Sequence, residues 1–247
     1  MDRRLARRDP RQARGAAGGH ADARRRDGHR QHLGITRRRG RCVHAAGPRR
    51  RPRPVRPRHR HRAPRGVGGE GRHPYAALVE YLDTLDADDV PRENVVLAAL
   101  GPRVLGLARD RTAGAHPYLV TPEHTREARE ILGTGPLLVP EQHVVLDADP
   151  VRAREAARTA LTNYFGMANY RNSWLRLGFT EDEISDGGSD RFVDAVVVHG
   201  TPADVAARLA EHLDAGADQV AVQLVAGEPG EPVEDGFARL AAELGLS

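Results

Sequence analysis

The chain changes character near residue 73, and this change limits what each part can fold into. Residues 1–73 contain 24 arginines and 5 acidic residues, a net charge of +19, and no aromatic residue. Their large apolar residues are Met1, Leu5, Leu33, Ile35, Val43, Val55 and Val67. So little apolar area cannot offset the conformational entropy that is lost on ordering. We therefore expect residues 1–73 to be an Arg-rich, disordered segment.

Residues 74–247 have the opposite charge and are long enough to form a domain. They contain 14 arginines and 29 acidic residues, a net charge of −15, and they are rich in Ala, Leu and Val. A segment of this length can bury one hydrophobic core of ordinary size. The composition therefore predicts a domain boundary near residue 73 and one folded domain over residues 74–247.

Composition and spacing exclude several classes of protein. The single cysteine, Cys42, cannot form an internal disulfide, which excludes a secreted disulfide scaffold. No run approaches the roughly 18 apolar residues of a membrane span, and no Cys and His residues have the spacing of zinc ligands. We expect a cytoplasmic protein that acts on a small molecule, with no membrane partner and no metal.

From residue 74 onward, the hydrophobic pattern alternates between helix and strand. Helical spacing occurs over residues 76–87, 102–112, 122–132, 150–165, 202–215 and 232–244. Short apolar runs of strand length occur over residues 94–100, 115–120, 137–146 and 219–225. Four strands that alternate with helices predict an α/β fold with a parallel sheet. Half of a barrel and a small doubly wound sheet both fit this pattern.

Two features interrupt the alternation. Pro140 falls inside the third apolar run, where it cannot donate a hydrogen bond to a neighbouring strand. Residues 166–200 are predicted to be a helical insertion, with Trp174 and Phe179 among its apolar anchors. These two residues either pack the insertion or close a substrate pocket.

The ends of the predicted strands supply the candidate binding residues, because parallel α/β folds bind ligands at the carboxyl ends of their strands. Gly101, Pro102 and Arg103 follow the first strand. The glycine permits close backbone approach, and the free N–H groups at the start of the helix attract an anion. These residues predict a phosphate site, although an ordinary strand-to-helix turn has the same sequence.

Polar residues mark the next two strands. His116 lies near a strand end, where it either donates to a flavin-type ring or substrate or caps a backbone carbonyl. Glu141, Gln142 and His143 form a polar trio inside an apolar strand, and they either face a pocket or mark a bulge. The sequence alone assigns no catalytic acid or base to these residues.

Four segments together resemble one known family. They are LAALGPRVLGLARDRTAGAHPYLVTPEHTREAREILG, VVLDADPVRAREAAR, NYFGMANYRNSWLRLGF and LDAGADQVAVQLV. They resemble the luciferase-like monooxygenase superfamily, and within it the coenzyme F420-dependent oxidoreductases. The resemblance implies that residues 74–247 are the C-terminal half of a (β/α)8 TIM barrel with a helical insertion. It also implies that Gly101, Pro102 and Arg103 lie near the cofactor phosphate.

The resemblance implies an oxidoreductase that moves a hydride between coenzyme F420 and an unknown organic substrate. An FMN-dependent monooxygenase of the same superfamily is the alternative. In both cases the cofactor carries the chemistry, while the protein contributes binding and orientation. We add His116 to the three cofactor-binding candidates, and a homodimer is a further expectation.

The first 73 residues depart from the family, and a shift of reading frame accounts for the departure. Back-translation of residues 1–5, 26–33 and 52–63 with a shift of one base permits WIGGS, ATGIVNIW and PGRFVLGIGTGH. These strings resemble the early strands of the family, in the right order. Our hypothesis is that residues 1 to about 66 are out of frame and that Met1 is an internal start. A stop codon in the shifted frame would exclude it.

Two other interpretations assume that the Arg-rich segment is read in its true frame. As a disordered arm, it would bind nucleic acid phosphates without reading sequence, because it has no aromatic residue to stack on bases. The second interpretation is an inactive fragment. A barrel with four of its eight strands has open edges and an exposed apolar face.

Overall fold

The computed structural model describes residues 33–38, 41–42, 74–227 and 229–246. Within the Arg-rich segment it places two antiparallel strands, β1 (Leu33–Arg38) and β2 (Arg41–Cys42). The rest of residues 1–73, on which the predictions of disorder and of a shifted frame fall, lies outside the described residues.

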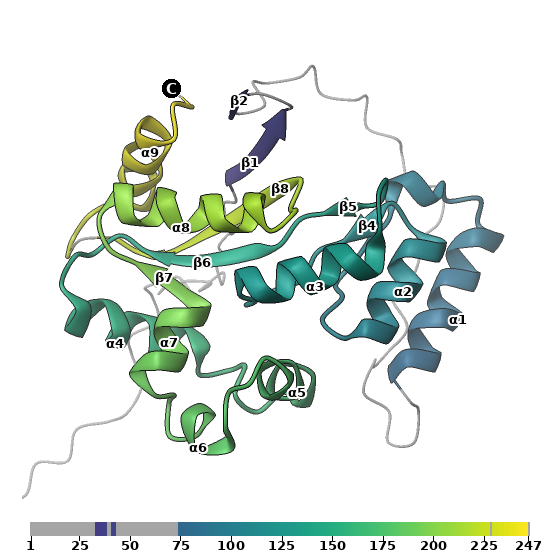
Figure 1. Ribbon diagram of the computed structural model, residues 1–247, viewed down its shortest axis with the longest axis horizontal. Helices are drawn as coiled ribbons and strands as arrows, with labels where there is room; N and C mark the ends of the chain where they lie inside the picture. Colours follow the sequence, from purple (N-terminus) through teal and green to yellow (C-terminus); the bar gives the residue numbers. More distant parts are fainter. Residues whose placement is uncertain (1–32, 39–40, 43–73, 228, 247) are drawn as a thin grey trace, which may run out of the picture. The chain divides into compact units, whose positions relative to one another are not determined.

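The part of the domain before residue 140 repeats a strand followed by a helix (Figure 1). After α1 (Pro74–Ala87) and the short 3-10 helix η1 (Arg92–Asn94), three two-residue strands form a parallel sheet. They are β3 (Val96–Leu97), β4 (Gly114–Ala115) and β5 (Leu137–Leu138). The helices α2 (Pro102–Arg111) and α3 (Pro122–Leu132) separate them. Each helix starts at its predicted proline, because proline at the first position loses no helical hydrogen bond.

A second sheet contains β6 (Glu141–Val145), β7 (Val197–His199) and β8 (Gln219–Ala226), in the strand order β2-β1-β8-β6-β7. β6 is parallel to both β7 and β8, while β1 is antiparallel to β8. Pro140 divides the predicted strand into β5 and β6, since it has no N–H to donate. The predicted α/β class with parallel strands is confirmed. The half-barrel is not confirmed, because the parallel strands of residues 74–247 lie in two separate sheets, one of β3, β4 and β5 and one that contains β6, β7 and β8.

The helical insertion is only partly as predicted. It contains α5 (Ala168–Arg176), α6 (Glu181–Ile184) and α7 (Asp190–Val196), and it follows α4 (Pro150–Leu161). It also contains β7, which the sequence analysis assigned to helix, and this assignment is wrong. Residues 196–198 are three valines, which favour strand, and β7 pairs with His143–Val145 of β6.

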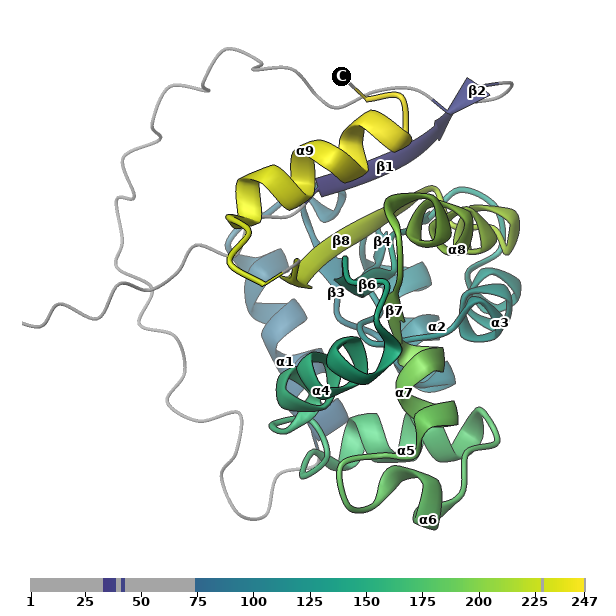
Figure 2. The ribbon, with the colours of Figure 1, turned by 90° about the vertical axis from the view of Figure 1, so that its left-hand side faces the viewer.

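Side chains along β6 and β8 point alternately to the two faces of the second sheet, and helices cover both faces. Val220, Val222 and Leu224 face α8 (Pro202–Asp214) and α9 (Val233–Glu243), where they form one apolar cluster with Leu209 and Leu240. Val145 and Val197 belong to a second cluster with α4, α5 and α7. Figure 2 shows these two groups of helices on opposite sides of β6 and β8. In the part of the chain that the structure describes, no helix is both long and apolar enough to cross a membrane.

Two buried histidines join α3 to its neighbours. His212 of α8 is 2.8 Å from the Thr125 hydroxyl through Nδ1, and its Nε2 donates to Gln142 Oε1 at 2.9 Å. His124 Nε2 donates to the Leu100 carbonyl at 2.8 Å. Burial lowers the pKa of each histidine to about 4. Arg176 also lowers the pKa of His124, and Arg208 that of His212, so both rings are neutral in the folded protein at pH 7.

These two pKa values predict that mild acid destabilises the fold. Between pH 6.5, the ordinary histidine pKa, and pH 4 the unfolded chain binds protons that the folded chain does not bind. The free energy of unfolding should therefore fall by about 2 kcal/mol per histidine between pH 7 and pH 5. Carboxylates titrate mainly below this window. Urea unfolding at the two pH values measures the change, and His212→Gln should remove about half of it. Equal stability at both pH values would contradict the prediction.

Candidate cofactor and substrate site

The turn at Gly101 exposes the start of α2. Gly101 is the N-cap and Pro102 the first helical residue, and no side chain caps the first turn. An uncapped first turn keeps N–H groups that attract an anion. Arg103, the second residue of this helix, is exposed. Its guanidinium stacks on the ring of Tyr75 from α1, with Cζ 4.0 Å from the ring centroid.

A second arginine, which the sequence analysis missed, lies at the same turn. Arg176, at the end of α5, donates through Nη2 to the carbonyl of Leu100 at 2.6 Å. A Cβ atom added to Gly101 would be 3.9 Å from Arg176 Nη1 and would meet nothing closer. Gly101 and Arg176 are far apart in the sequence, so no spacing could have joined them. The turn therefore combines open backbone, a helix N-terminus and a guanidinium.

His116 is bound to the backbone. Its Nδ1 is 2.5 Å from the carbonyl oxygen of Val139, which is the carbonyl-capping alternative of the sequence analysis. The ring is half-buried and makes an edge contact with Tyr118, with centroids 5.8 Å apart. His116 thus holds β4 to β5 and borders a group of aromatic rings.

The polar trio on β6 is divided between two faces of the sheet, as alternation requires. Gln142 points to one side, where its Nε2 donates to the carbonyl of Val196 at 3.0 Å. Glu141 and His143 share the other side, and both are fully buried. His143 Nδ1 donates to Glu141 Oε1 at 2.6 Å. The trio is a paired acid and imidazole with a structural glutamine between them, and the strand has no bulge within the trio.

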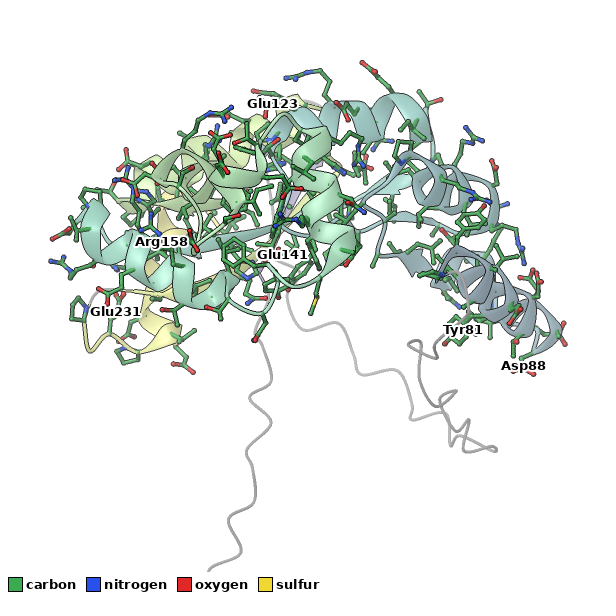
Figure 3. The ribbon with its side chains drawn as sticks, turned by 90° about the horizontal axis from the view of Figure 1, so that it is seen from below. Tyr81, Asp88, Glu123, Glu141, Arg158 and Glu231 are labelled. Carbon is green, nitrogen blue, oxygen red and sulfur yellow. The ribbon has the colours of Figure 1, made fainter. Side chains whose placement is uncertain are left out.

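Glu141 and His143 are the inner end of a chain of hydrogen bonds. His143 Nε2 is 3.4 Å from Gln223 Nε2 of β8, and Gln223 Oε1 accepts the hydroxyl of Tyr118 at 2.5 Å. Because Nδ1 donates to Glu141, Nε2 of the neutral ring is an acceptor for the amide of Gln223. Four residues from three separate segments therefore fix one another. In Figure 3, Glu141 lies among the strands and helices, unlike Tyr81 on α1 and Asp88 just after it.

Aromatic rings border this chain on the side of the insertion. Tyr164 lies 6.0 Å from the ring of His143 and 6.5 Å from that of Tyr118, and Tyr170 makes an edge contact with Tyr164 at 5.0 Å. Burial raises the pKa of Tyr170 to about 12, with contributions from Tyr164 and Glu141, so its hydroxyl stays protonated. The half-buried tyrosines form the outer boundary of the candidate site, and the buried carboxylate lies behind them.

Leu119 is held in a strained conformation at the inner edge of this site. It is fully buried and has φ 51°, in the left-handed region that side chains with a Cβ atom rarely adopt. Its N–H lies 3.4 Å from Glu141 Oε2, and its carbonyl accepts the indole N–H of Trp174 at 3.2 Å. Such strain persists only where surrounding contacts determine it, and it is common at binding sites.

Several solved structures are similar to part of the chain. No family model and no curated protein matches the chain. An F420-dependent secondary alcohol dehydrogenase in complex with an F420–acetone adduct matches at 12% identity, over 60% of this chain and 46% of that chain, with a TM-score of 0.42. The coenzyme F420-dependent tetrahydromethanopterin reductase from Methanopyrus kandleri matches at 18% identity, over 60% and 48%, with a TM-score of 0.38.

A third solved structure, that of apo-MsnO8, matches at 15% identity, over 72% of this chain and 63% of that chain, with a TM-score of 0.46. The chain therefore spans about half the length of the two F420-dependent enzymes and less than two thirds of MsnO8. Two of these three proteins are named for coenzyme F420.

Proposed function

We propose that the protein is an oxidoreductase of the luciferase-like class, which moves a hydride between coenzyme F420 and an organic substrate. The observation that carries the proposal is the buried chain of Glu141, His143, Gln223 and Tyr118 beside a set of aromatic rings. Polar groups that converge from separate strands are one of the features that mark a binding site. The resemblance of residues 74–247 to this class supplies the cofactor.

The residues at the Gly101 turn fit the anionic part of coenzyme F420, which carries a phosphate and carboxylates. The space beside Gly101 is open, and Arg176 borders it. We infer that Gly101, Pro102, Arg103 and Arg176 hold the phosphate, and that His116 and Tyr118 lie toward the ring. When bound, F420 supplies the atom that accepts or gives the hydride.

The residues of this chain position the substrate and move its proton. When a hydride moves to or from a neutral carbon of the substrate, a proton must also move, and a nearby oxygen gives or takes that proton. The hydroxyl of Tyr118 is half-buried, and it donates a hydrogen bond to Gln223 Oε1 at 2.5 Å, which fixes its direction. We assign Tyr118 to this task. Glu141 and His143 are positioning residues that hold Gln223, while Tyr164 and Tyr170 keep water from the site.

Titration with coenzyme F420 tests the cofactor and the frame hypothesis together. By the resemblance, the early strands build most of the ring site, so the chain as printed should bind F420 weakly. We call a chain that is translated in the shifted frame up to about residue 66 the restored chain. The restored chain should bind F420 saturably and more tightly than it binds FMN. Quenching of F420 fluorescence measures both affinities. Saturable binding of FMN alone would favour the monooxygenase, and a lack of F420 binding in the restored chain would exclude the proposal.

A matched pair of variants tests the anion site in the restored chain. Arg176→Gln should weaken F420 binding by about tenfold, because one charge-assisted hydrogen bond is lost. The control is Arg171→Gln on the same helix, since Arg171 pairs with Glu181 rather than with the Gly101 turn. Equal affinity in both variants would contradict the assignment of Arg176.

A further inference from the structure

Leu119 differs from the other residues that have a left-handed backbone. In the part of the chain that the structure describes, three residues other than glycine have positive φ, namely Asp89, Leu119 and Asp186. The two aspartates are exposed, and a short polar side chain stabilises the left-handed conformation through local hydrogen bonds. Leu119 is fully buried, and its side chain has no polar atom. Contacts of its backbone and the packing around it therefore maintain this conformation.

The backbone on both sides of Tyr118 is held to one residue of β6. The carbonyl of Pro117 accepts the backbone N–H of Glu141 at 2.8 Å, and the N–H of Leu119 is 3.4 Å from Glu141 Oε2. Between these two contacts, the hydroxyl of Tyr118 donates to Gln223 Oε1 at 2.5 Å. Because β6 lies between β8 and β7 in the second sheet, Glu141 is a fixed reference for the backbone that carries Tyr118.

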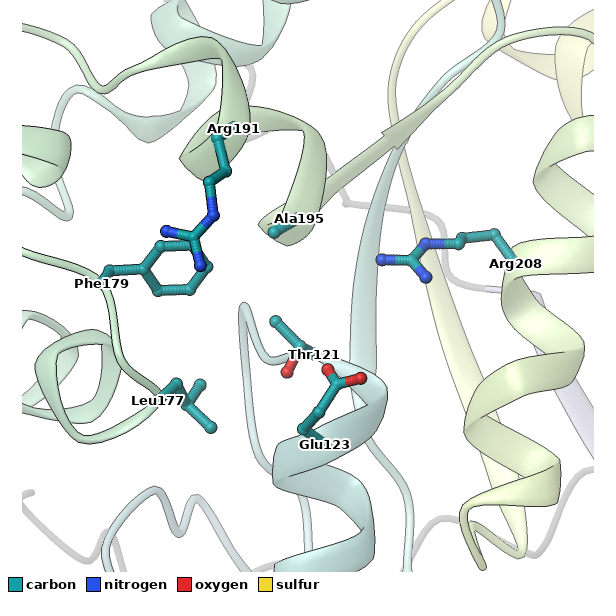
Figure 4. Close-up of a pocket in the computed structure, with 7 residues that line it drawn as sticks. All are labelled: Thr121, Glu123, Leu177, Phe179, Arg191, Ala195 and Arg208. Carbon is teal, nitrogen blue, oxygen red and sulfur yellow. The ribbon is translucent and has the colours of Figure 1, made fainter.

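The carbonyl of Leu119 connects the same segment to the insertion. It accepts the indole N–H of Trp174, which is fully buried in α5, at 3.2 Å. A cavity of about 250 Å³ is lined by Thr121 at the start of α3 and by Leu177 and Phe179 of the insertion (Figure 4). Because packing between α3 and the insertion is interrupted at this cavity, the bond from Trp174 is a direct connection between the insertion and the segment before α3.

The sign of φ at Leu119 decides whether both backbone contacts exist together. The angle φ is the rotation between the N–H side and the carbonyl side of a residue, so a change from 51° to a negative value turns one side relative to the other. The N–H then loses Glu141, or the carbonyl loses Trp174. The left-handed conformation therefore joins the indole of Trp174 to the backbone that carries Tyr118.

We propose that Leu119 is a positioning residue for Tyr118, and that its left-handed backbone couples the direction of the Tyr118 hydroxyl to the indole of Trp174. The inference rests on the proposed function, which assigns proton transfer to Tyr118. The insertion thereby takes part in the site through the backbone of Leu119 as well as by packing. A substitution that opposes positive φ should release the hydroxyl and the indole together, and one that permits positive φ should release neither.

Two substitutions of similar volume test this role in the full chain. A β-branched side chain opposes positive φ more strongly than an unbranched one, so Leu119→Ile should disturb the conformation and Leu119→Met should not. Trp174 is the only tryptophan, so NMR shows one indole N–H signal. In Leu119→Ile this N–H should exchange with solvent at least about tenfold faster than in the parent. A carbon-13 label at Cζ of tyrosine reports the hydroxyl of Tyr118, and its signal, assigned with Tyr118→Phe, should shift in Leu119→Ile alone.

Leu161→Ile is the control for packing. Leu161 is also fully buried and belongs to the same apolar cluster, but it lies in the helix α4. It should leave both signals as in the parent. Three results would overturn the proposal: equal signals in Leu119→Ile and Leu119→Met, the same changes in Leu161→Ile as in Leu119→Ile, or a changed indole signal with an unchanged signal of Tyr118.

A second pair of variants applies if Leu119→Ile does not fold. Leu119→Gly and Leu119→Ala both remove the side chain, but only glycine adopts positive φ without strain. The indole N–H should therefore exchange faster in Leu119→Ala than in Leu119→Gly, and equal exchange would overturn the proposal. These measurements contain no cofactor. Titration with F420 detects a failure of the proposed function separately, so the two failures are distinguishable.

Discussion

Replacing Trp174 with alanine should lower the free energy of unfolding by about 3–5 kcal/mol, which is the usual cost of removing a buried large aromatic side chain. Trp174 is fully buried in α5. Its ring contacts those of Phe165, Tyr170 and Phe192, with centroids 4.8–5.9 Å apart. The substitution would leave a cavity among these rings, and closely packed neighbours collapse into such a cavity only in part.

The substitution should also affect the candidate site, because the indole N–H of Trp174 holds the carbonyl of Leu119. Without that bond, the left-handed conformation of Leu119 loses one of the contacts that maintain it. Urea unfolding measures the stability, and hydrogen exchange at Val120 reports the local change. Tyr81→Ala is the control, since Tyr81 is 48% exposed on α1 and should cost less than about 1 kcal/mol. Similar losses in the two variants would contradict the prediction.

The sequence predicts the helices well because their starts depend on local chemistry. Thr121 and Thr201 accept N–H groups of the first helical turn, and prolines follow both of them at the first position. These signals lie within a few residues, so they can be read without knowledge of the fold. β7 was missed for the opposite reason. A three-residue strand becomes stable only when it pairs with β6, and this partner is distant in the sequence.

The candidate site depends even more on tertiary contacts. Gly101 could be proposed because it follows a predicted strand, and His116 because it lies near a strand end. Arg176 reaches the Gly101 turn only after α5 has folded over it. Strand alternation alone predicts that Glu141 and His143 share one face of β6, because they are two residues apart. Alternation could not predict their connection to Tyr118, because Gln223 makes that connection from β8.

The two members of the buried pair on β6 should differ in what their loss costs. His143→Leu would leave the carboxylate of Glu141 buried without its partner, and we expect it to destabilise the fold by about 3–5 kcal/mol. Glu141→Gln keeps an acceptor for the imidazole N–H of His143, but its amide NH2 then faces the N–H of Leu119, which loses its acceptor. It should cost less than His143→Leu, about 2 kcal/mol, because it buries no unpaired charge, although one hydrogen bond becomes neutral and one is lost.

The double variant Glu141→Leu/His143→Leu separates stability from function. When both partners of a buried hydrogen-bonded pair are replaced by apolar residues, neither leaves an unpaired polar group behind, so the double variant should be more stable than His143→Leu alone. Urea unfolding of the single and double variants gives the coupling energy, which should exceed about 1 kcal/mol. Because the double variant leaves Gln223 without the acceptor at His143 Nε2, the hydroxyl of Tyr118 loses its fixed direction.

If Glu141 and His143 position Tyr118, the double variant in the restored chain should bind F420 normally and lose at least about tenfold in the rate of hydride transfer. The anion site at Gly101 and Arg176 contains neither residue, which is why binding should persist. A double variant that is as stable as the parent and transfers hydride at the same rate would assign the pair to packing alone. A double variant that is as stable but transfers hydride more slowly would show that Glu141 and His143 are retained for the site, since apolar residues pack there equally well.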